Sequence, residues 1–318
     1  MAYSVDQAWV NQYVNSVDLL SQQKNSILEN SVEQGDAIGE YKFFERIEPF
    51  SFTKKTASNQ ATTFTDVTHN KRAVAFDDYT VNLYVDKRDL KRALIDPQSA
   101  YVEGGVAGWN VEKDQIIMDA IFGTAKEGKA TGVAFTDKVF DTANQTVDLA
   151  FLAGDPIGAG NGTGTGAGII NSGLTLPKIL KARQILLSNK ALVAGDQIFC
   201  AIDPIDEIDL MGIEQFIRNN YVGDKPYEMG IDPEGYIGYW LGIHWLRSNH
   251  VPTVDAAVDY RRCPMYVKSG IGMVKGGVPE VDVMKNPERD GAWTIHMEGS
   301  GGAVRKEEKK VVEIRTGA

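Results

Sequence analysis

The fold is decided by residues 85–125, which read VDKRDLKRALIDPQSAYVEGGVAGWNVEKDQIIMDAIFGTA. Asp96-Pro97 marks a boundary in this stretch, because proline keeps the residue before it extended and is well tolerated in the first turn of a helix. The apolar residues that follow recur on one side of a helix: Val102, Val106, Trp109, Ile116, Ile117, Ala120 and Ile121. We therefore predict a helix over about 98–124 that ends near Gly123 and is roughly 37 Å long at about 1.5 Å per residue.

Upstream of this helix, two strand-like segments flank a polar stretch. Phe43 to Phe52 and Ala73 to Val85 have the composition and alternation typical of strands, whereas residues 53–70 are mostly Thr, Lys, Asn, Ser and Gln. These segments predict a long hairpin with a polar tip. Because an isolated two-stranded ribbon is only marginally stable in water, we expect the hairpin to lie against another subunit.

The N-terminal segment has an apolar stripe at helical spacing, formed by Trp9, Val10, Tyr13, Val14, Val17 and Leu20. Polar residues and Gly35 and Gly39 separate it from the next apolar segment. This pattern fits an arm that docks on a neighbouring subunit. It fits equally well a first helix that packs on its own domain.

Downstream, alternating signals predict a middle lobe. A glycine-rich loop at 158–168 is followed by a helix over 174–189, a buried strand over 197–202 and a helix from Pro204 to about Arg218. The stretch from Met265 to Thr316 contains short strand candidates separated by turns, and we expect it to form an antiparallel sheet. Together these elements predict an α+β fold with extended appendages.

Composition excludes several function classes. The 318 residues carry a formal net charge of -10, which disfavours sequence-specific DNA binding. The first residues lack the pattern of a signal peptide, and no apolar run approaches the roughly 20 residues of a membrane helix, so we expect an aqueous compartment. Cys200 and Cys263 have no zinc or disulfide spacing, which predicts two buried free thiols.

The candidate chemical motifs are weak. Gly162-x-Gly164-x-x-Ala167 lacks the strand and helix that a dinucleotide site requires. The acidic residues of 203–209 lack calcium-loop spacing and are better explained as a helix N-terminus. The four histidines show no metal-ligand spacing. We therefore predict no catalytic residue, no cofactor and no metal.

The order of these parts, together with short motifs, carries a family resemblance. The most specific motifs are Val85-Asp86-Lys87-Arg88-Asp89, Asp96-Pro97, and the stretch from Lys113 to Ala125 that reads KDQIIMDAIFGTA. Weaker agreement continues through GYWLG at 238–242, RSN at 247–249 and KSGIG at 268–272. Over nearly its whole length, the chain resembles the Hong Kong 97-type major capsid proteins of tailed bacteriophages.

The resemblance implies an α+β Hong Kong 97-type capsid fold with five parts. Residues 1–42 would be the N-arm and 43–85 the extended hairpin loop. Residues 86–129 and 263–318 would form the peripheral domain, with the spine helix at about 98–124. Residues 130–262 would form the axial domain, which meets its equivalents around fivefold and sixfold centres.

The resemblance also implies a function without catalysis. The protein would self-assemble into pentamers and hexamers of the icosahedral head that encloses the double-stranded DNA genome, in the host cytoplasm during assembly and then in the virion. A shell protein of an encapsulin-like bacterial nanocompartment is the alternative. The implied partners are copies of itself, a separate scaffolding protein, a portal and, as a further candidate, a decoration protein. Contact with packaged DNA would be non-specific, and no membrane is involved. The candidate subunit-interface residues are Trp9, Tyr13, Lys54, Lys55, Phe64, Lys71 and Arg72.

Overall fold

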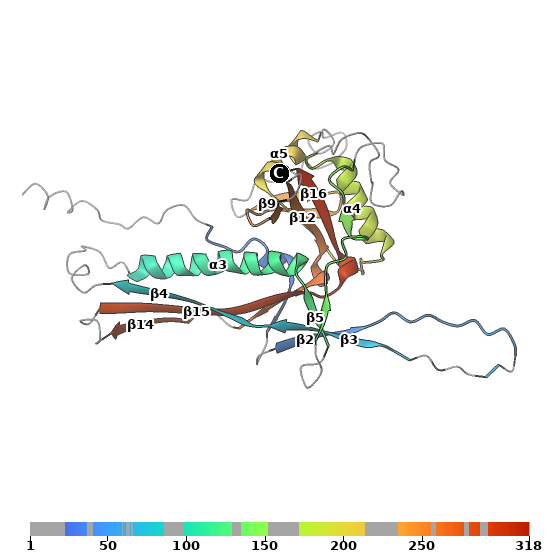
Figure 1. Cartoon of the computed structure of the whole chain (residues 1–318), viewed down its shortest axis with the longest axis horizontal. Coiled ribbons are helices and arrows are strands. Elements are labelled where there is room, and N and C mark those ends of the chain that lie inside the picture. Colours follow the sequence, from blue (N-terminus) through green and yellow to red (C-terminus); the bar gives the residue numbers. More distant parts are fainter. Residues whose placement is uncertain are drawn as a thin grey trace, which may run out of the picture.

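The computed structural model describes residues 23–36, 41–58, 60–61, 64, 66–85, 98–128, 135–151, 172–213, 235–255, 259–276, 280–286 and 292–317, and the statements below concern these residues. A long layer of one helix on extended strands carries a rounded lobe on one side (Figure 1). A thin ribbon projects from one end of this layer.

The long helix α3 (Gln98–Phe122) confirms the prediction over 98–124. It ends where the Gly123 amide donates to the Asp119 carbonyl oxygen (2.8 Å), one turn back. Ile117 and Ile121 are fully buried, as expected, but Val106 is exposed and Asp114 is buried. The prediction of one buried apolar side is therefore only partly confirmed, because different parts of the chain cover α3 along its length.

The hairpin consists of β2 (Tyr41–Ile47) and β3 (His69–Ala75), which pair antiparallel from Tyr41↔Ala75 to Ile47↔His69. The predicted bounds are partly wrong. The first strand ends at Ile47 and not at Phe52, and the second begins at His69 and not at Ala73. The predicted second strand is also divided at Phe76, and its second part is a separate strand, β4 (Asp77–Val85). This strand pairs with β15 (Ala292–Arg305) and not with β2. Alternation in a sequence identifies a strand but not its partner.

Beneath α3 lies a five-stranded sheet built around β15. Three strands pair antiparallel with β15: β4, β14 (Glu280–Asn286) and β13 (Ile271–Lys275). The strand β1 (Glu33–Asp36) pairs in parallel with β13. Glycines permit the close approach of α3. A Cβ atom at Gly299 of β15 would lie only 2.9 Å from the Trp109 ring of the helix.

At the base of the ribbon, two short strands continue its sheet. The strand β5 (Ala125–Glu127) follows α3 directly and pairs with β3, and β6 (Thr136–Lys138) pairs with β5. The end of α3 is thus linked to the ribbon by backbone hydrogen bonds.

The rounded lobe contains a seven-stranded sheet, whose order is β7 (Thr146–Val147), β16 (Val311–Gly317), β12 (Tyr260–Val267), β8 (Ile198–Ile202), β10 (Ile243–Arg247) and β9 (Tyr236–Trp240), with β11 (Thr253–Val254) on β12. The helices α4 (Leu176–Ser188) and α5 (Pro204–Gly212) belong to the same lobe (Figure 1). The predicted helix at 174–189 and strand at 197–202 are confirmed. The predicted helix from Pro204 ends at Gly212, and residues 214–234 lie outside the described residues.

The expected single sheet at the C-terminus is wrong. Its strands are shared between two sheets, because β12 and β16 join the lobe whereas β13, β14 and β15 lie under α3. The 3-10 turns at 268–270 and 308–310 redirect the chain from one sheet to the other. The expected domain boundary at 262/263 falls inside β12.

Candidate functional site

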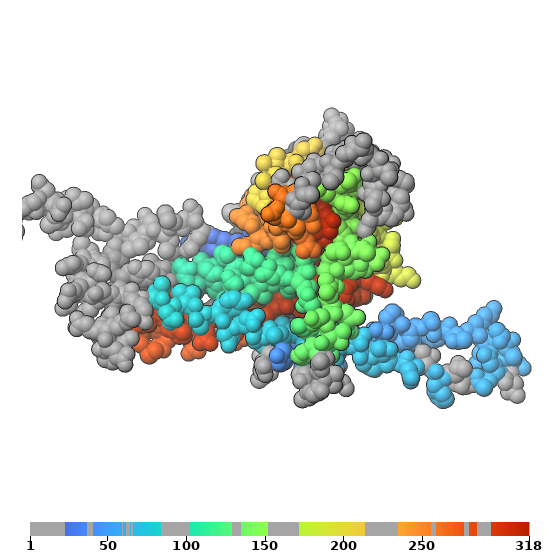
Figure 2. Space-filling model, viewed as in Figure 1, coloured from blue at the N-terminus to red at the C-terminus, as the bar shows by residue number. Residues whose placement is uncertain are grey.

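The tip of the ribbon exposes large apolar side chains to solvent. Phe52 is 98% exposed and Phe64 is 95% exposed, and Phe50 is also exposed. Figure 2 shows the ribbon clear of the rest of the molecule on this face. Exposed phenylalanines grouped at one place on a surface are typical of an interaction site.

Four of the predicted interface residues lie on the ribbon with their side chains outside the core. Lys54, Lys55 and Phe64 are exposed at the tip. Lys71 lies on β3, where its Nζ atom donates to the Glu45 carboxylate (2.5 Å). The Lys71 hydrogen bond and charge lower the pKa of Glu45. These positions are accessible to a partner.

Arg72 is different, because it is buried in its own subunit with 1% of its surface exposed. Its guanidinium donates to Glu308 (2.6 Å) and lies 3.7 Å from Glu127. Burial lowers the pKa of Arg72, although the neighbouring Glu308 partly offsets this effect. We therefore remove Arg72 from the interface residues. It fixes the base of the ribbon to the C-terminal turn, a role that the local pattern Lys71-Arg72 does not reveal.

Trp9 and Tyr13 lie outside the described residues, but the point where their segment joins the body is well defined. Asp114 of α3 is fully buried, and its carboxylate accepts hydrogen bonds from Ser26 Oγ (2.5 Å) and from the backbone amides of Ile27 and Leu28 (3.0 Å each). Gln23 Nε2 donates to the same carboxylate (2.5 Å). The chain is thus bound to the spine helix from residue 23 onward.

A second contact strengthens this anchor. Glu29 binds Lys113 of α3 (2.5 Å) and Lys275 of β13. Burial tends to raise the pKa of Glu29, but the hydrogen bonds and charges of the two lysines outweigh it, so its pKa is lowered. Sequence reasoning missed both Asp114 and Glu29. The one available signal was an aspartate within the apolar half of the helix.

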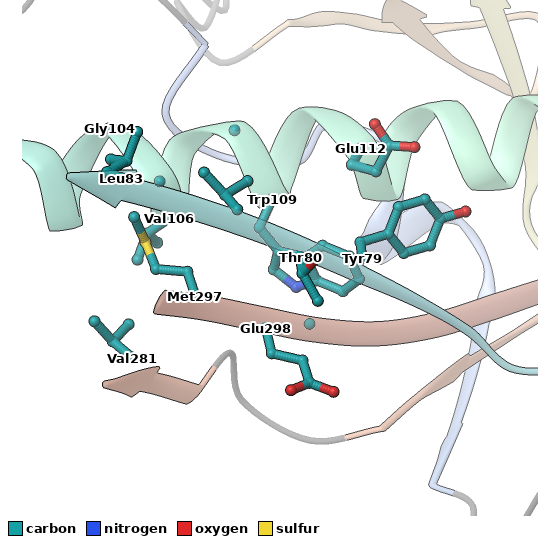
Figure 3. Close-up of a pocket in the computed structure, with 14 residues that line it drawn as sticks. Tyr79, Thr80, Leu83, Gly104, Val106, Trp109, Glu112, Val281, Met297 and Glu298 are labelled. Carbon is teal, nitrogen blue, oxygen red and sulfur yellow. The ribbon is translucent and has the colours of Figure 1, made fainter. Parts of the chain in front are cut away.

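A groove runs between α3 and the sheet along the first half of the helix (Figure 3). Its volume is about 470 Å³. Trp109, Val106, Met297 and Val81 contribute apolar walls, and Gly108 leaves a gap on the helix side. Figure 3 shows Trp109 extending from the helix toward β4 and β15. Sequence reasoning missed this groove too, although Gly104-Gly105 and Gly108 inside a predicted helix were a signal.

Three acidic residues near the start of α5 each have a partner within the chain. Asp203 caps the helix by accepting from the Ile205 amide (3.1 Å), as predicted. Asp206 pairs with Arg261 (3.2 Å), and Glu207 lies 3.4 Å from Arg247. Within the described part of the chain, no group of three or more His, Cys, Asp or Glu side chains is arranged to hold a metal ion.

The remaining predictions concern burial and motifs. Cys200 and Cys263 are buried free thiols, as predicted, and burial raises the pKa of each. The Gly162 to Ala167 motif lies outside the described residues. Among the helices that the structure describes, none has the length and apolar character needed to cross a bilayer.

Comparisons with known proteins identify the family. A family model described as phage capsid protein matches residues 5–317. No curated protein sequence matches the chain. The fold is similar to the capsid structure of cyanophage P-SCSP1u, with a TM-score of 0.65, 16% identity, and coverage of 99% of this chain and 95% of that chain. It is also similar to the capsid of Ralstonia phage GP4 (TM-score 0.68, 10% identity, coverage 95% and 94%) and to the cyanophage Pam1 capsid asymmetric unit (TM-score 0.66, 10% identity, coverage 95% and 94%). The chain therefore belongs to the phage capsid protein family, and its fold is the Hong Kong 97-type fold of phage capsids.

Proposed function

We propose that this protein assembles into the pentamers and hexamers of an icosahedral head that encloses double-stranded DNA. The observation that carries the proposal is the ribbon, whose phenylalanines are left uncovered by their own chain. Burial of a phenylalanine side chain contributes roughly 1.5–3 kcal/mol, so covering this tip with another subunit is a strong driving force. Many such contacts, repeated around symmetry axes, can close a shell.

The parts of the molecule have distinct roles in this proposal. Residues 1–42 act as the N-arm, of which the segment from residue 23 onward is bound to its own spine helix. Within residues 43–85, the extended loop is the ribbon that begins and ends with β2 and β3, because β4 pairs with β15 and not with the ribbon. The lobe that includes most of 130–262, together with β12 and β16, acts as the axial domain. The layer of α3 and β15 acts as the peripheral domain.

Further partners follow from the same assignment. We expect a separate scaffolding protein, a portal and, as a further candidate, a decoration protein. With a net charge of -10, the subunit has little attraction for DNA, so its contacts with the packaged genome are non-specific. If this chain expressed alone gives uniform closed shells of native size, the separate scaffolding protein is not needed.

The decisive experiment compares the intact chain with a variant whose residues 50–66 are replaced by a short turn. Both are produced in cells that carry the complete set of head genes and are analysed by sedimentation velocity and negative-stain microscopy. We expect shells from the intact chain and only soluble subunits from the variant. Circular dichroism and thermal melting of the purified variant serve as the folding control. Shells of normal size from the variant would contradict the role of the ribbon.

A further inference from the structure

Four charged side chains form a closed ring at the base of the ribbon. Arg46 of β2 and Arg72 of β3 face the carboxylates of Glu127 on β5 and of Glu308 in the 3-10 turn at 308–310. The nitrogen–oxygen distances around the ring are 3.2 Å for Arg46 to Glu127, 3.7 Å for Glu127 to Arg72, 2.6 Å for Arg72 to Glu308 and 3.9 Å for Glu308 to Arg46. Each guanidinium therefore faces both carboxylates. We call these four residues the ion ring.

Arg305 connects the ion ring to the end of the spine helix. Its guanidinium donates to the carbonyl oxygens of Ile121 (2.7 Å) and Gly123 (2.8 Å) at the C-terminal end of α3. A cation is favoured there because the carbonyl end of a helix carries partial negative charge. The Nε atom of Arg305 also lies 3.8 Å from a Glu308 oxygen. The Glu308 carboxylate is thus shared by the end of α3 and by both strands of the ribbon.

The ion ring is largely removed from water. Arg72 is 1% exposed and Arg305 is fully buried, whereas the side chains of Glu127 and Glu308 are 14% and 25% exposed. Within the described residues, Nε and Nη1 of Arg72 and Nε of Arg305 are buried and have no hydrogen-bond acceptor, so nearby carboxylates alone compensate their charge. Dissolved salt screens such buried pairs much less than surface pairs. Loss of one carboxylate would leave a buried cation unpaired, which is strongly unfavourable.

The other contacts at the base hold the ribbon less specifically. The strand β3 pairs with β5 over only two residue pairs, and β2 lies at the edge of this sheet and pairs with β3. Val74 and Phe44 pack in a small apolar cluster with Val274 and Val304. Apolar packing is non-directional, whereas hydrogen bonds between arginine and carboxylate groups require a defined geometry. The ion ring therefore supplies the directional side-chain contacts between the ribbon and the body.

We infer that the ion ring fixes the direction of the ribbon relative to α3 in the single subunit, before any partner binds. Figure 1 shows the ribbon continuing the long axis of the layer. A ribbon that is already oriented loses less conformational freedom when subunits associate, and this favours assembly. The inference concerns one subunit and goes beyond the proposed function.

The distance between two spin labels on dilute, unassembled subunits tests the inference. Cysteines that carry the labels replace Thr68 at the ribbon base and Glu103 on α3, which are both exposed, and the two native thiols are buried. Pulsed electron paramagnetic resonance then measures the distribution of the distance between the labels. We expect a single narrow distribution for the parent subunit and one about twice as wide for Glu308→Gln, because glutamine is uncharged and keeps an acceptor oxygen for only one arginine.

Two further variants complete the test. Glu45→Gln removes an exposed ion pair with Lys71 on the same ribbon and should leave the distribution unchanged. Arg72→Met/Glu308→Met removes both charges of one pair together, which preserves a fold better than removing one charge, and should widen the distribution even if Glu308→Gln fails to fold. An unchanged narrow distribution in either folded ring variant would overturn the inference, as would a broad distribution in the parent subunit. Because the measurement uses single subunits, failure of the chain to form shells would count against the proposed function alone.

Discussion

Replacement of Asp114 by asparagine should release the N-terminal segment from the spine helix. One oxygen of the buried carboxylate accepts from Ser26 Oγ and from the Leu28 amide, and the other accepts from Gln23 and from the Ile27 amide. Asparagine keeps an oxygen for only one of these pairs and turns an NH₂ group toward the donors of the other.

The magnitude follows from the two hydrogen bonds that are lost. A hydrogen bond to a charged group contributes about 1.5–3 kcal/mol, and a buried donor left without an acceptor adds a penalty. Because the Gln23 side chain can turn toward water and recover part of its loss, we expect a total of about 3 kcal/mol. Since about 1.4 kcal/mol corresponds to a factor of ten, amide hydrogen exchange at Ile27 and Leu28 should accelerate roughly 100-fold.

Hydrogen exchange followed by mass spectrometry on the unassembled subunit measures this effect, and urea unfolding gives the accompanying loss of stability. Asp119→Asn is the matched control, because Asp119 is an exposed residue of the same helix whose carboxylate accepts only from Gln115 (2.9 Å) among the contacts described. If Asp114→Asn behaves like this control in both assays, the carboxylate does not hold the segment and the reasoning is refuted.

Three further perturbations test other parts of the structure. Gly302→Ala should lower the free energy of unfolding by about 1–3 kcal/mol in urea titrations, because its Cβ would fall on the Ala75 carbonyl oxygen; Gly301→Ala, with no neighbour closer than 3.5 Å, should change little. Burial lowers the pKa of Lys178 from 10.5 to about 8. Between pH 8 and 10.5 the unfolded chain therefore binds more protons than the folded chain, and the free energy of unfolding rises with pH. In urea titrations, the free energy of unfolding of the wild type should rise by about 1 kcal/mol more than that of Lys178→Met between pH 8 and 9. The two free thiols should not react with DTNB at pH 8 in the folded protein and should react fully in urea; rapid reaction without urea would contradict their burial.

Local patterns in the sequence predicted several elements of this fold accurately. The bounds of α3 follow from helical spacing between Asp96-Pro97 and Gly123, and the bounds of β8 follow from a short apolar run before Asp203. The cap of α5 was predictable for the same reason. Each of these features depends on residues that are close together in the sequence, so it can be recognised from the sequence alone.

The sequence predicted the candidate site only in part. It pointed to the ribbon tip, because a polar tip between two strands is a local feature. It gave the wrong role to Arg72, whose partner Glu308 lies 236 residues away, and it gave no role to Asp114, whose partners lie 86 to 91 residues away. In the sequence alone, a charged residue that is buried against a distant partner cannot be distinguished from a charged residue on the surface.

By itself, the sequence determined the long helix α3, the helices α4 and α5, the buried strand β8 and the presence of a hairpin with a polar tip. Only the tertiary structure decided that β4 leaves the ribbon to pair with β15, that the C-terminal strands are shared between two sheets, and that α3 leaves a groove at Gly108. The physical reason is that strand pairing and helix packing join surfaces of similar apolar character from distant parts of the chain. Periodicity specifies which face of an element is apolar, but the shape of the opposing surface selects the partner.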